Sequence, residues 1–235
     1  MALLKQFKTP YGIIRVMRNR DGTREYYQNG CFHSQATPRG VSVCAYVHVI
    51  YQIIRQRKAR NVLIIGCGGG TLATMLSRKG CDVTVVDINP AAFGIAKDYF
   101  NMPSQVKCVE HDGIAYIRKA KQSYDAVVID VFDTANKVPP AFTTKGFLGA
   151  AKKILKRGGV FIMNIITKND ADKSAYRVAN NMHAVGIKVS MVDWPNEKDR
   201  NSILVGGSLA GVAIPSGDEP SFIKKDMKGL VCVKL

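Results

Sequence analysis

The chain has 235 residues, of which 46% are hydrophobic and 22% charged, and its formal net charge is +16. This length suits one large domain, or one domain with a small appendage, and the composition excludes a disordered chain. No apolar run approaches the roughly 20 residues that span a bilayer, and the opening "MALLKQFKTPYG" has too short an apolar stretch for a secretory signal. We therefore predict a cytoplasmic protein with no membrane partner.

Thiols, imidazoles and positive charges are dispersed along the chain. The six cysteines form no CxxC pair, and the four histidines are equally scattered. We expect free thiols in a reducing compartment and no metal site. Basic residues gather in short clusters at 55–60, 152–157 and 224–225. Because solvated faces account for such clusters, nucleic acid is a partner that we consider but do not favour.

The first part of the chain predicts a small β-meander. "YGIIRVMRN" and "REYYQ" are typical of strands, and "RDGT" and "QNGC" are typical of the turns that join them. We expect three or four strands within residues 9–35. A helix with one apolar stripe follows at 43–54, where valine and isoleucine recur at helical spacing. The change predicts an N-terminal β-hairpin domain, residues 1–40, and a second domain, residues 41–235.

From residue 61 onward, strand and helix patterns alternate. Strands are predicted at 61–65, 83–87, 106–109, 125–130, 159–165, 187–192 and 202–206, and helices near 71–79, 91–99, 113–120, 144–156 and 172–184. "NVLII" and "DAVVI" are nearly all apolar, as in strands buried on both faces. The alternation indicates an α/β fold with a parallel, doubly wound sheet of seven strands. We expect Gly158-Gly159 to end the helix at 144–156, and we read "PSGDEPS" near the end of the chain as a loop.

A glycine-rich turn, "GCGGG", follows the first of these strands. In a doubly wound sheet, ligands bind beyond the carboxyl ends of the strands. Glycines at such a place let a ligand approach the backbone closely, and the next helix presents free N–H groups. We expect Gly66, Gly68 and Gly70 to line a nucleoside site.

Acidic residues end the next two strands. Asp87 closes "VTVVD", where a carboxylate can accept hydrogen bonds from ribose hydroxyls. Asp112 stands at the start of a predicted helix. It can cap this helix, contact an adenine amino group, or do both. The adjoining Ile88 and Gly113 belong to the same predicted cofactor site. Threonine replaces the third glycine of the dinucleotide pattern GxGxxG, so we favour an S-adenosylmethionine-type ligand over NAD.

A pair of carboxylates follows the fourth strand. Asp130 and Asp133 stand three residues apart in "VVIDVFDTANK". We expect both to point into one pocket beside the cofactor, where they would hold an ammonium group and one would take a proton from an attacking amine. The alternative is a loop that caps the next helix.

Together these motifs resemble the aminopropyltransferases, the spermidine and spermine synthases, which share the Rossmann-like class I S-adenosylmethionine-dependent methyltransferase fold. "TPYGIIRV" and "QNGCFHS" resemble the family's opening strand and hairpin turn. "VVDINP", "YDAVVIDVFD…VPPAFTTKGF" and "NSILVGGS" resemble its ribose-binding strand, its Asp-x-x-Asp loop and its last strand. The resemblance covers most of the chain.

The resemblance implies polyamine biosynthesis, in which an aminopropyl group moves from decarboxylated S-adenosylmethionine to a small amine or polyamine. Asp130 falls on the family's base or amine-orienting aspartate, Asp87 on the ribose acid and Asp112 on the adenine contact. His33 replaces a glutamine that contacts the cofactor, and Tyr46 lies near the pocket tyrosine. The N-terminal hairpin implies a homodimer.

The glycine turn departs from the family pattern, which usually reads Gly-Gly-Gly-Asp-Gly. Gly69 stands where the family keeps its aspartate. That aspartate is expected to hold the ammonium of the aminopropyl arm and to repel the carboxylate of ordinary S-adenosylmethionine. Its loss removes a contact worth about 1.5–3 kcal/mol, together with the repulsion.

We therefore expect a spermidine synthase-like transferase that moves an aminopropyl or other alkyl group from decarboxylated or ordinary S-adenosylmethionine to an amine. One alternative is an N-methyltransferase that uses ordinary S-adenosylmethionine. The other is a degenerate, non-catalytic homologue that binds a nucleoside or RNA. The sequence does not name the acceptor amine.

Overall fold

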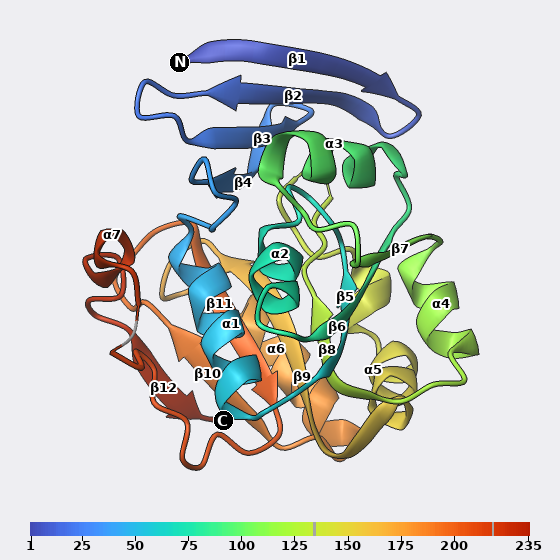
Figure 1. Ribbon diagram of the computed structural model, residues 1–235. Coiled ribbons are helices and arrows are strands. Elements are labelled where there is room, and N and C mark those ends of the chain that lie inside the picture. Colours follow the sequence, from blue (N-terminus) through green and yellow to red (C-terminus); the bar gives the residue numbers. More distant parts are fainter. Residues whose placement is uncertain (134, 218) are drawn as a thin grey trace.

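Two β-sheets, one above the other, organise the chain in the computed structural model, which describes residues 1–133, 135–217 and 219–235 (Figure 1). The upper sheet is an antiparallel meander with the strand order β1-β2-β3-β4. Its strands are β1 (Ala2–Thr9), β2 (Gly12–Arg18), β3 (Arg24–Gln28) and β4 (Cys31–Ala36). The predicted meander is confirmed, and β1 adds a strand ahead of the predicted region. The domain boundary at residue 40 stays a prediction.

The upper sheet is fastened to the rest of the molecule through helix α3 (Ala91–Phe100). Ile14, Val16 and Tyr26 form a buried cluster with Ile95 and Phe100 of that helix. Burial of these apolar side chains stabilises the contact by the hydrophobic effect. One face of the meander is therefore held against the helix that follows β6.

The lower sheet has eight strands in the order β12-β10-β11-β9-β8-β5-β6-β7. They are β5 (Asn61–Ile65), β6 (Asp82–Asp87), β7 (Lys107–Glu110), β8 (Tyr124–Ile129), β9 (Leu155–Thr167), β10 (Val189–Asp193), β11 (Arg200–Gly206) and β12 (Val231–Lys234). The strands from β5 to β9 pair in parallel, whereas β11 is antiparallel to both of its neighbours. The expectation of a wholly parallel sheet was wrong at this end, because the short connection from β10 to β11 can only make a hairpin.

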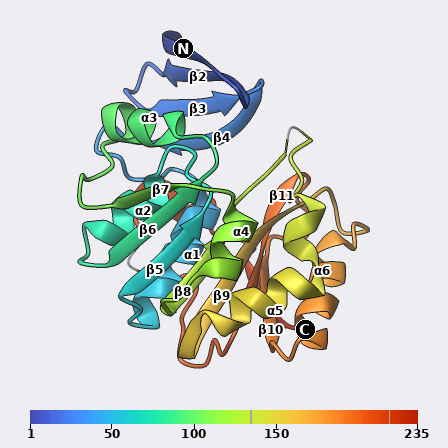
Figure 2. The same ribbon diagram turned by 90° about the vertical axis from the view of Figure 1, so that its right-hand side faces the viewer.

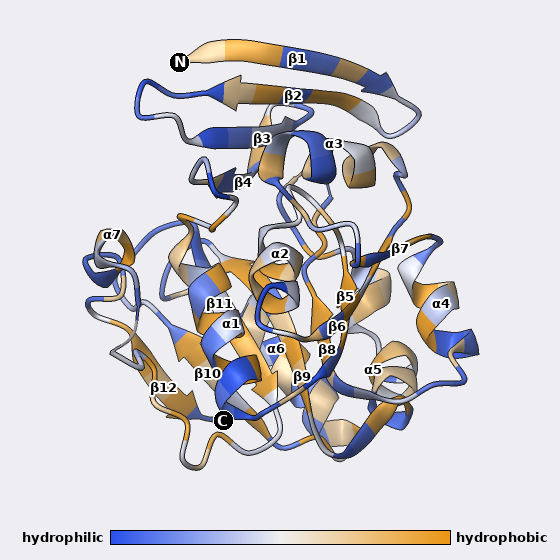
Figure 3. Ribbon diagram, in the orientation of Figure 1, coloured by the Kyte–Doolittle hydropathy of each residue, from blue (hydrophilic) through white to orange (hydrophobic). Residues whose placement is uncertain are grey.

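Helices cover both faces of the lower sheet, as expected for a doubly wound fold. α1 (Ala45–Gln56), α2 (Thr71–Ser77) and α7 (Ser221–Lys224) contribute to the core on one face. α4 (Gly113–Lys119), α5 (Lys145–Lys153) and α6 (Ser174–Ala184) pack on the other, where Figure 2 shows them together. A short 3₁₀ helix, η1 (Pro140–Thr143), precedes α5. The strands between these layers are mostly apolar in Figure 3, which agrees with burial on both faces.

Gly158 and Gly159 do not end a helix, as the sequence had suggested. α5 ends at Lys153, and β9 begins at Leu155 and runs through both glycines. A Cβ at Gly159 would lie 2.9 Å from the carbonyl oxygen of Lys156 and 3.1 Å from that of Asp125. The strand pairing shifts register at this point, so glycine is needed for close backbone approach rather than for helix termination.

The sequence predicted only a loop, "PSGDEPS", in this last part of the chain, and residue 218 of that loop lies outside the described residues. Residues 219–235 also hold regular structure. They supply α7 and the edge strand β12, which pairs antiparallel with β10 and adds an eighth strand to the predicted seven. The indole nitrogen of Trp194, just after β10, donates to the carbonyl of Asp226 at 2.8 Å and ties this segment to the sheet. Within the described residues, no helix has the length and apolar character needed to cross a membrane.

Candidate functional site

The glycine turn joins β5 to α2 and has a backbone that only glycine tolerates. Gly66, Gly68 and Gly70 have φ angles of 97°, 50° and 64°. A Cβ at Gly66 would lie 2.1 Å from the carbonyl oxygen of Asp130, and one at Gly70 would lie 3.0 Å from the Cβ of Ala96. These glycines pack the turn against the end of β8 and against α3, because an added Cβ would collide with these elements.

Asp87 ends β6 beside this turn, as the sequence predicted. Its carboxylate accepts from the backbone N–H of Cys67 at 2.7 Å and from that of Asn89 at 2.8 Å. Burial raises the pKa of Asp87, and these backbone donors act against the rise. The carboxylate therefore braces the glycine turn, and the neighbouring Ile88 is exposed. A ribose contact at Asp87 or Ile88 stays a prediction.

Asp112 caps helix α4, the simpler of the roles considered for it. Its exposed side chain accepts from the backbone N–H of Ala115 at 2.7 Å. The next residue, Gly113, is buried, and a Cβ there would lie 2.4 Å from the side chain of Ile65. Gly113 thus lets α4 approach the end of β5. The adenine contact predicted for this pair is compatible with the cap and stays a prediction.

The upper sheet reaches the glycine turn through β4. The hydroxyl of Ser34 accepts from the backbone N–H of Gly69 at 3.0 Å. His33 has no partner in the register between β3 and β4, which is irregular here, and its ring meets that of Tyr26 edge to face at 6.1 Å. Burial lowers the pKa of His33, which favours a neutral imidazole. Ser34 was missed by the sequence reasoning, although it stands next to the predicted His33.

Gly69 is confined by side chains rather than by its own backbone angle. A Cβ there would lie 3.0 Å from the Cβ of Ser34 and 3.1 Å from the ring of Phe100. Both contacts are tighter than ordinary van der Waals distances. The upper sheet and α3 therefore leave little room for a side chain at the position that holds aspartate in the family pattern.

Asp130 follows β8 and is half-buried beside the same turn. Its backbone N–H donates to the carbonyl of Ile65 at 2.9 Å. Its carboxylate accepts from the amide nitrogen of Asn164 at 2.9 Å and from the hydroxyl of Tyr46 at 3.4 Å. Burial raises the pKa of Asp130, and the two donors act against the rise. Burial also raises the pKa of Tyr46 well above its ordinary value, so its hydroxyl keeps its proton.

Asp133 is held within its own loop. One carboxylate oxygen accepts from the backbone N–H groups of Ala135 and Lys137, at 2.8 and 3.0 Å. The Asp133 N–H in turn donates to the Lys137 carbonyl. No contact that the structure describes joins Asp133 to Asp130. These hydrogen bonds close a turn within the loop, whereas the predicted alternative was a cap on the next helix, and the side chain that caps α5 is that of Thr144. A shared pocket for the two carboxylates stays a prediction.

Asn164 and Asn201 are polar residues of the site that the sequence reasoning missed. Asn164 is fully buried in β9, and its amide oxygen accepts from the amide nitrogen of Asn201 in β11 at 3.0 Å. The signal was a single asparagine within the apolar run "FIMNII". A buried polar side chain in such a strand needs partners, and these often lie at a site.

Taken together, the glycine turn and Asp87 lie at the carboxyl ends of β5 and β6, and Asp130 lies at that of β8. β5 pairs in parallel with both β6 and β8, so these groups lie together at the carboxyl-terminal end of the sheet. A half-buried carboxylate with two neutral donors can bind a cation or accept a proton there. The arrangement suits a nucleoside ligand on one side and an amine on the other.

Comparison with known proteins finds relatives of two kinds. The model of the spermine/spermidine synthase domain matches residues 44–193. A polyamine aminopropyltransferase of Chromobacterium violaceum is 34% identical over 110 residues, which cover 45% of this chain and 42% of that protein. The eEF1A lysine and N-terminal methyltransferase of Xenopus laevis is 33% identical over 138 residues, which cover 53% of this chain and 20% of that protein. The chain thus spans less than half the length of these two relatives.

The fold is also similar to that of a solved spermidine synthase. A spermidine synthase in complex with the transition-state analogue AdoDATO superposes with a TM-score of 0.69 at 18% identity, covering 96% of this chain and 88% of that one. Both kinds of relative are transferases. With a family match that spans the glycine turn, Asp87 and Asp130, the chain belongs to the spermine/spermidine synthase family.

Proposed function

We propose that the protein transfers an alkyl group from an S-adenosylmethionine-type sulfonium nucleoside to an amine. The observation that carries this proposal is the half-buried carboxylate of Asp130, which stands against the glycine turn and accepts from Asn164 and Tyr46. A carboxylate that is withdrawn from water is stabilised by a cation or by hydrogen-bond donors. This one has only neutral donors among its described contacts, which leaves it able to receive a cationic amine.

The residues present fit a nucleoside of this kind. Four of the five residues from Gly66 to Gly70 are glycines, so a ligand can approach the backbone closely, and Asp87 offers a carboxylate at the strand end where ribose hydroxyls are bound in doubly wound sheets. Asp112, Ile88, Gly113 and His33 would complete the site. A sulfonium supplies a good leaving group, so the protein has mainly to align the reactants and hold the amine without its proton.

Asp130 would orient the acceptor and take its proton. An ammonium group bound to Asp130 first gives up one proton, and the lone pair that this leaves on nitrogen attacks the carbon attached to sulfur. The carbon–nitrogen bond forms, the carbon–sulfur bond breaks, and its electron pair stays on sulfur as a neutral thioether. The proton passes to Asp130 and then to solvent. The raised pKa of Asp130 brings it closer to that of a general base working near neutrality.

The identity of the group transferred depends on Gly69. Family membership favours an aminopropyl group from decarboxylated S-adenosylmethionine, with a small amine or polyamine as acceptor. The absence of a carboxylate at Gly69, and the pressure of Ser34 and Phe100 on this position, favour methyl transfer from ordinary S-adenosylmethionine as the second candidate. A homodimer through the upper sheet and a cytoplasmic location are further parts of the proposal, by analogy with the family.

Mass spectrometry of products decides between these functions. The protein is incubated with ordinary or decarboxylated S-adenosylmethionine and a panel of mono-, di- and polyamines. We expect an alkylated amine with at least one nucleoside, and Asp130→Asn as the inactive control. The increase in product mass identifies an aminopropyl or a methyl group. No product with either nucleoside, together with RNA binding that falls steeply with salt, would instead support the non-catalytic homologue.

A further inference from the structure

Three polar side chains form a relay across neighbouring strands of the lower sheet. The amide nitrogen of Asn201 donates to the amide oxygen of Asn164 at 3.0 Å, and the amide nitrogen of Asn164 donates to Asp130 at 2.9 Å. The register between β9 and β11 places Asn164 opposite Ile203 and Ile166 opposite Asn201. The two asparagines are diagonal neighbours on one face, within reach of each other. β8, β9 and β11 each contribute one member of the relay.

The partners of Asn164 fix which way its amide points. An amide carries an acceptor at one end and a donor at the other. With Asn201 donating to its oxygen, the nitrogen of Asn164 faces the Asp130 carboxylate. If the Asn164 amide turned over, its oxygen would face a carboxylate oxygen, and two acceptors would oppose each other unless Asp130 held a proton.

The surroundings of Asp130 offer no charge that could replace this contact. Tyr46 on α1 donates to its second oxygen, and Cys44, just before α1, is a titratable neighbour. Burial raises the pKa of both groups, so both stay neutral. Among the interactions described for Asp130, none is with a cation. Its charge therefore depends on the two neutral donors.

Asn201 itself is held in place from both sides along β11. The side chain of Arg200 donates to Asp193 at 2.7 and 2.9 Å, and the hydroxyl of Ser202 donates to the same carboxylate at 2.8 Å. These bonds on either side fix the backbone of β11 at Asn201. The position of the Asn201 amide is thus determined by the sheet and not by a mobile loop.

We propose that Asn201 is a positioning residue, which holds the Asn164 amide with its nitrogen toward Asp130 and so keeps that carboxylate ionised for the incoming amine. In this role Asn201 acts through Asn164. The inference rests on the proposed role of Asp130 for its meaning in catalysis. The effect on Asp130 itself can be measured without turnover.

The test is a titration of Asp130 by carbon-13 carboxyl NMR, with its signal assigned by its loss in Asp130→Asn. Asn201→Leu removes the donor at similar volume, and Asn201→Gln keeps an amide. We expect Asn201→Leu to raise the pKa of Asp130 by about one unit, a tenfold change in the protonation equilibrium. Asn201→Gln should stay near the parent value. Asn181→Leu, at an asparagine that donates to the Thr143 carbonyl, is the matched control and should leave the titration unchanged.

A double-mutant cycle separates this relay from a general loss of structure. In the background of Asn164→Leu, adding Asn201→Leu should not move the pKa of Asp130 further, because the intermediary is gone. An unchanged pKa in Asn201→Leu, or an equal shift with and without Asn164, overturns the inference. Because the titration uses no nucleoside and no amine, its result is independent of whether transfer is observed. Where transfer is observed, the acidic limb of kcat should move with the NMR pKa while KM for the nucleoside stays constant.

Discussion

At the scale of single residues, the surroundings of Asp130 in the folded protein disfavour the ionised form of its carboxyl group. Its pKa is raised by burial from the ordinary value of 3.8, so the unfolded chain releases this proton at lower pH than the folded chain does. The contribution of Asp130 to stability therefore falls as pH rises from that ordinary value through the folded pKa. A site that keeps such a group gives up stability for reactivity.

The substitution Asp130→Asn should separate the effect of Asp130 on stability from its effect on transfer. We expect transfer to fall by about 10²- to 10⁴-fold, the range for loss of a general base. The free energy of unfolding of the variant, measured in urea, should gain on that of the parent protein between about pH 4 and about pH 8.

Asp125→Asn is the contrasting control for this pH dependence. Backbone N–H groups and Lys156 lower the pKa of Asp125, so its stabilising contribution is present at neutral pH and is lost as pH falls through the folded pKa. This variant should therefore lose stability at about pH 8 and lose less at about pH 4. A parallel loss in both variants would contradict our account of Asp130.

Gly69 is the residue on which donor choice depends. Gly69→Asp should shift binding toward decarboxylated S-adenosylmethionine and away from the ordinary form, because it restores an attractive carboxylate for an ammonium and a repulsive one for a carboxylate. Crowding against Ser34 and Phe100 should also lower the free energy of unfolding by about 1–3 kcal/mol.

Gly69→Asn has nearly the same volume without the charge and controls for the crowding. It should lose a similar amount of stability and show no shift in preference. Calorimetric titration with both nucleosides measures the preference. If the parent protein already binds the decarboxylated form far more tightly, our reading of Gly69 is wrong.

At the scale of elements, an ionic cluster around the buried Arg200 joins the segment after β9, the end of β10 and the start of β11. Arg200 makes a two-bonded contact with Asp193 at 2.7 and 2.9 Å, and both residues are buried. Asp170, after β9, lies 2.8 Å from the same guanidinium. This cluster fixes the start of β11, from which Asn201 reaches the site.

Arg200→Met should cost about 3–5 kcal/mol of unfolding free energy, because it leaves the Asp193 carboxylate buried without its partner. The double variant Arg200→Met/Asp193→Leu should recover much of that loss, since the unpaired charge is gone. Urea unfolding of the three proteins gives the comparison. Equal stabilities of the single and double variants would show that Asp193 finds another partner.

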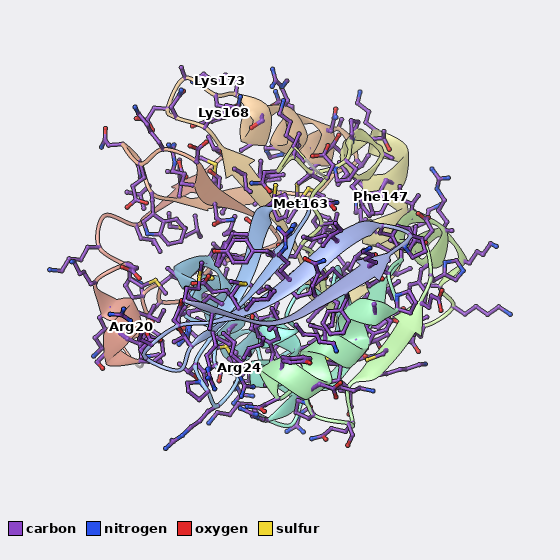
Figure 4. The ribbon with its side chains drawn as sticks, turned by 90° about the horizontal axis from the view of Figure 1, so that it is seen from above. Arg20, Arg24, Phe147, Met163, Lys168 and Lys173 are labelled. Carbon is purple, nitrogen blue, oxygen red and sulfur yellow. The ribbon has the colours of Figure 1, made fainter. Side chains whose placement is uncertain are left out.

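At the scale of the whole molecule, the positive charge is spread around the fold. Seen from above, Arg20 and Arg24 of the upper sheet lie on the opposite side of the molecule from Lys168 and Lys173 (Figure 4). The net charge of +16 creates a field that repels a small dication, although a local carboxylate can override it. Dispersal also explains why the basic clusters do not single out one nucleic-acid face.

If the acceptor is a diamine, kcat/KM should rise as salt increases from about 20 mM to about 200 mM, because ions screen the repulsion over a Debye length of about 10 Å. A monoamine should show a weaker rise. The measurement is initial rate at limiting amine with saturating nucleoside. A fall with salt for the diamine would mean that acidic groups in the loop after β8, such as Asp133, govern its approach.

The fold was largely predictable from the sequence because its signals are local. Apolar strands, glycine turns and amphipathic helices predicted the seven strands and the order of helices between them. The predictions from sequence failed where the structure of a segment depends on its pairing with another strand. Gly159 was taken for a helix terminator although it serves a close approach between β8 and β9. β12 is a short strand that exists because β10 offers it an edge.

The sequence by itself determined the glycine turn and the acidic residues at the strand ends, because the chemistry of these residues depends on their type and their place beside a strand. Only the tertiary structure decided how each acid is used. Asp133 bonds its own loop, whereas Asp130 is enclosed by Tyr46 and Asn164 from elements far away in the chain. The environment of a carboxylate comes from contacts between distant segments, and no local pattern records it. For the same reason Asn201, two strands away from Asp130, entered the site only once the sheet was known.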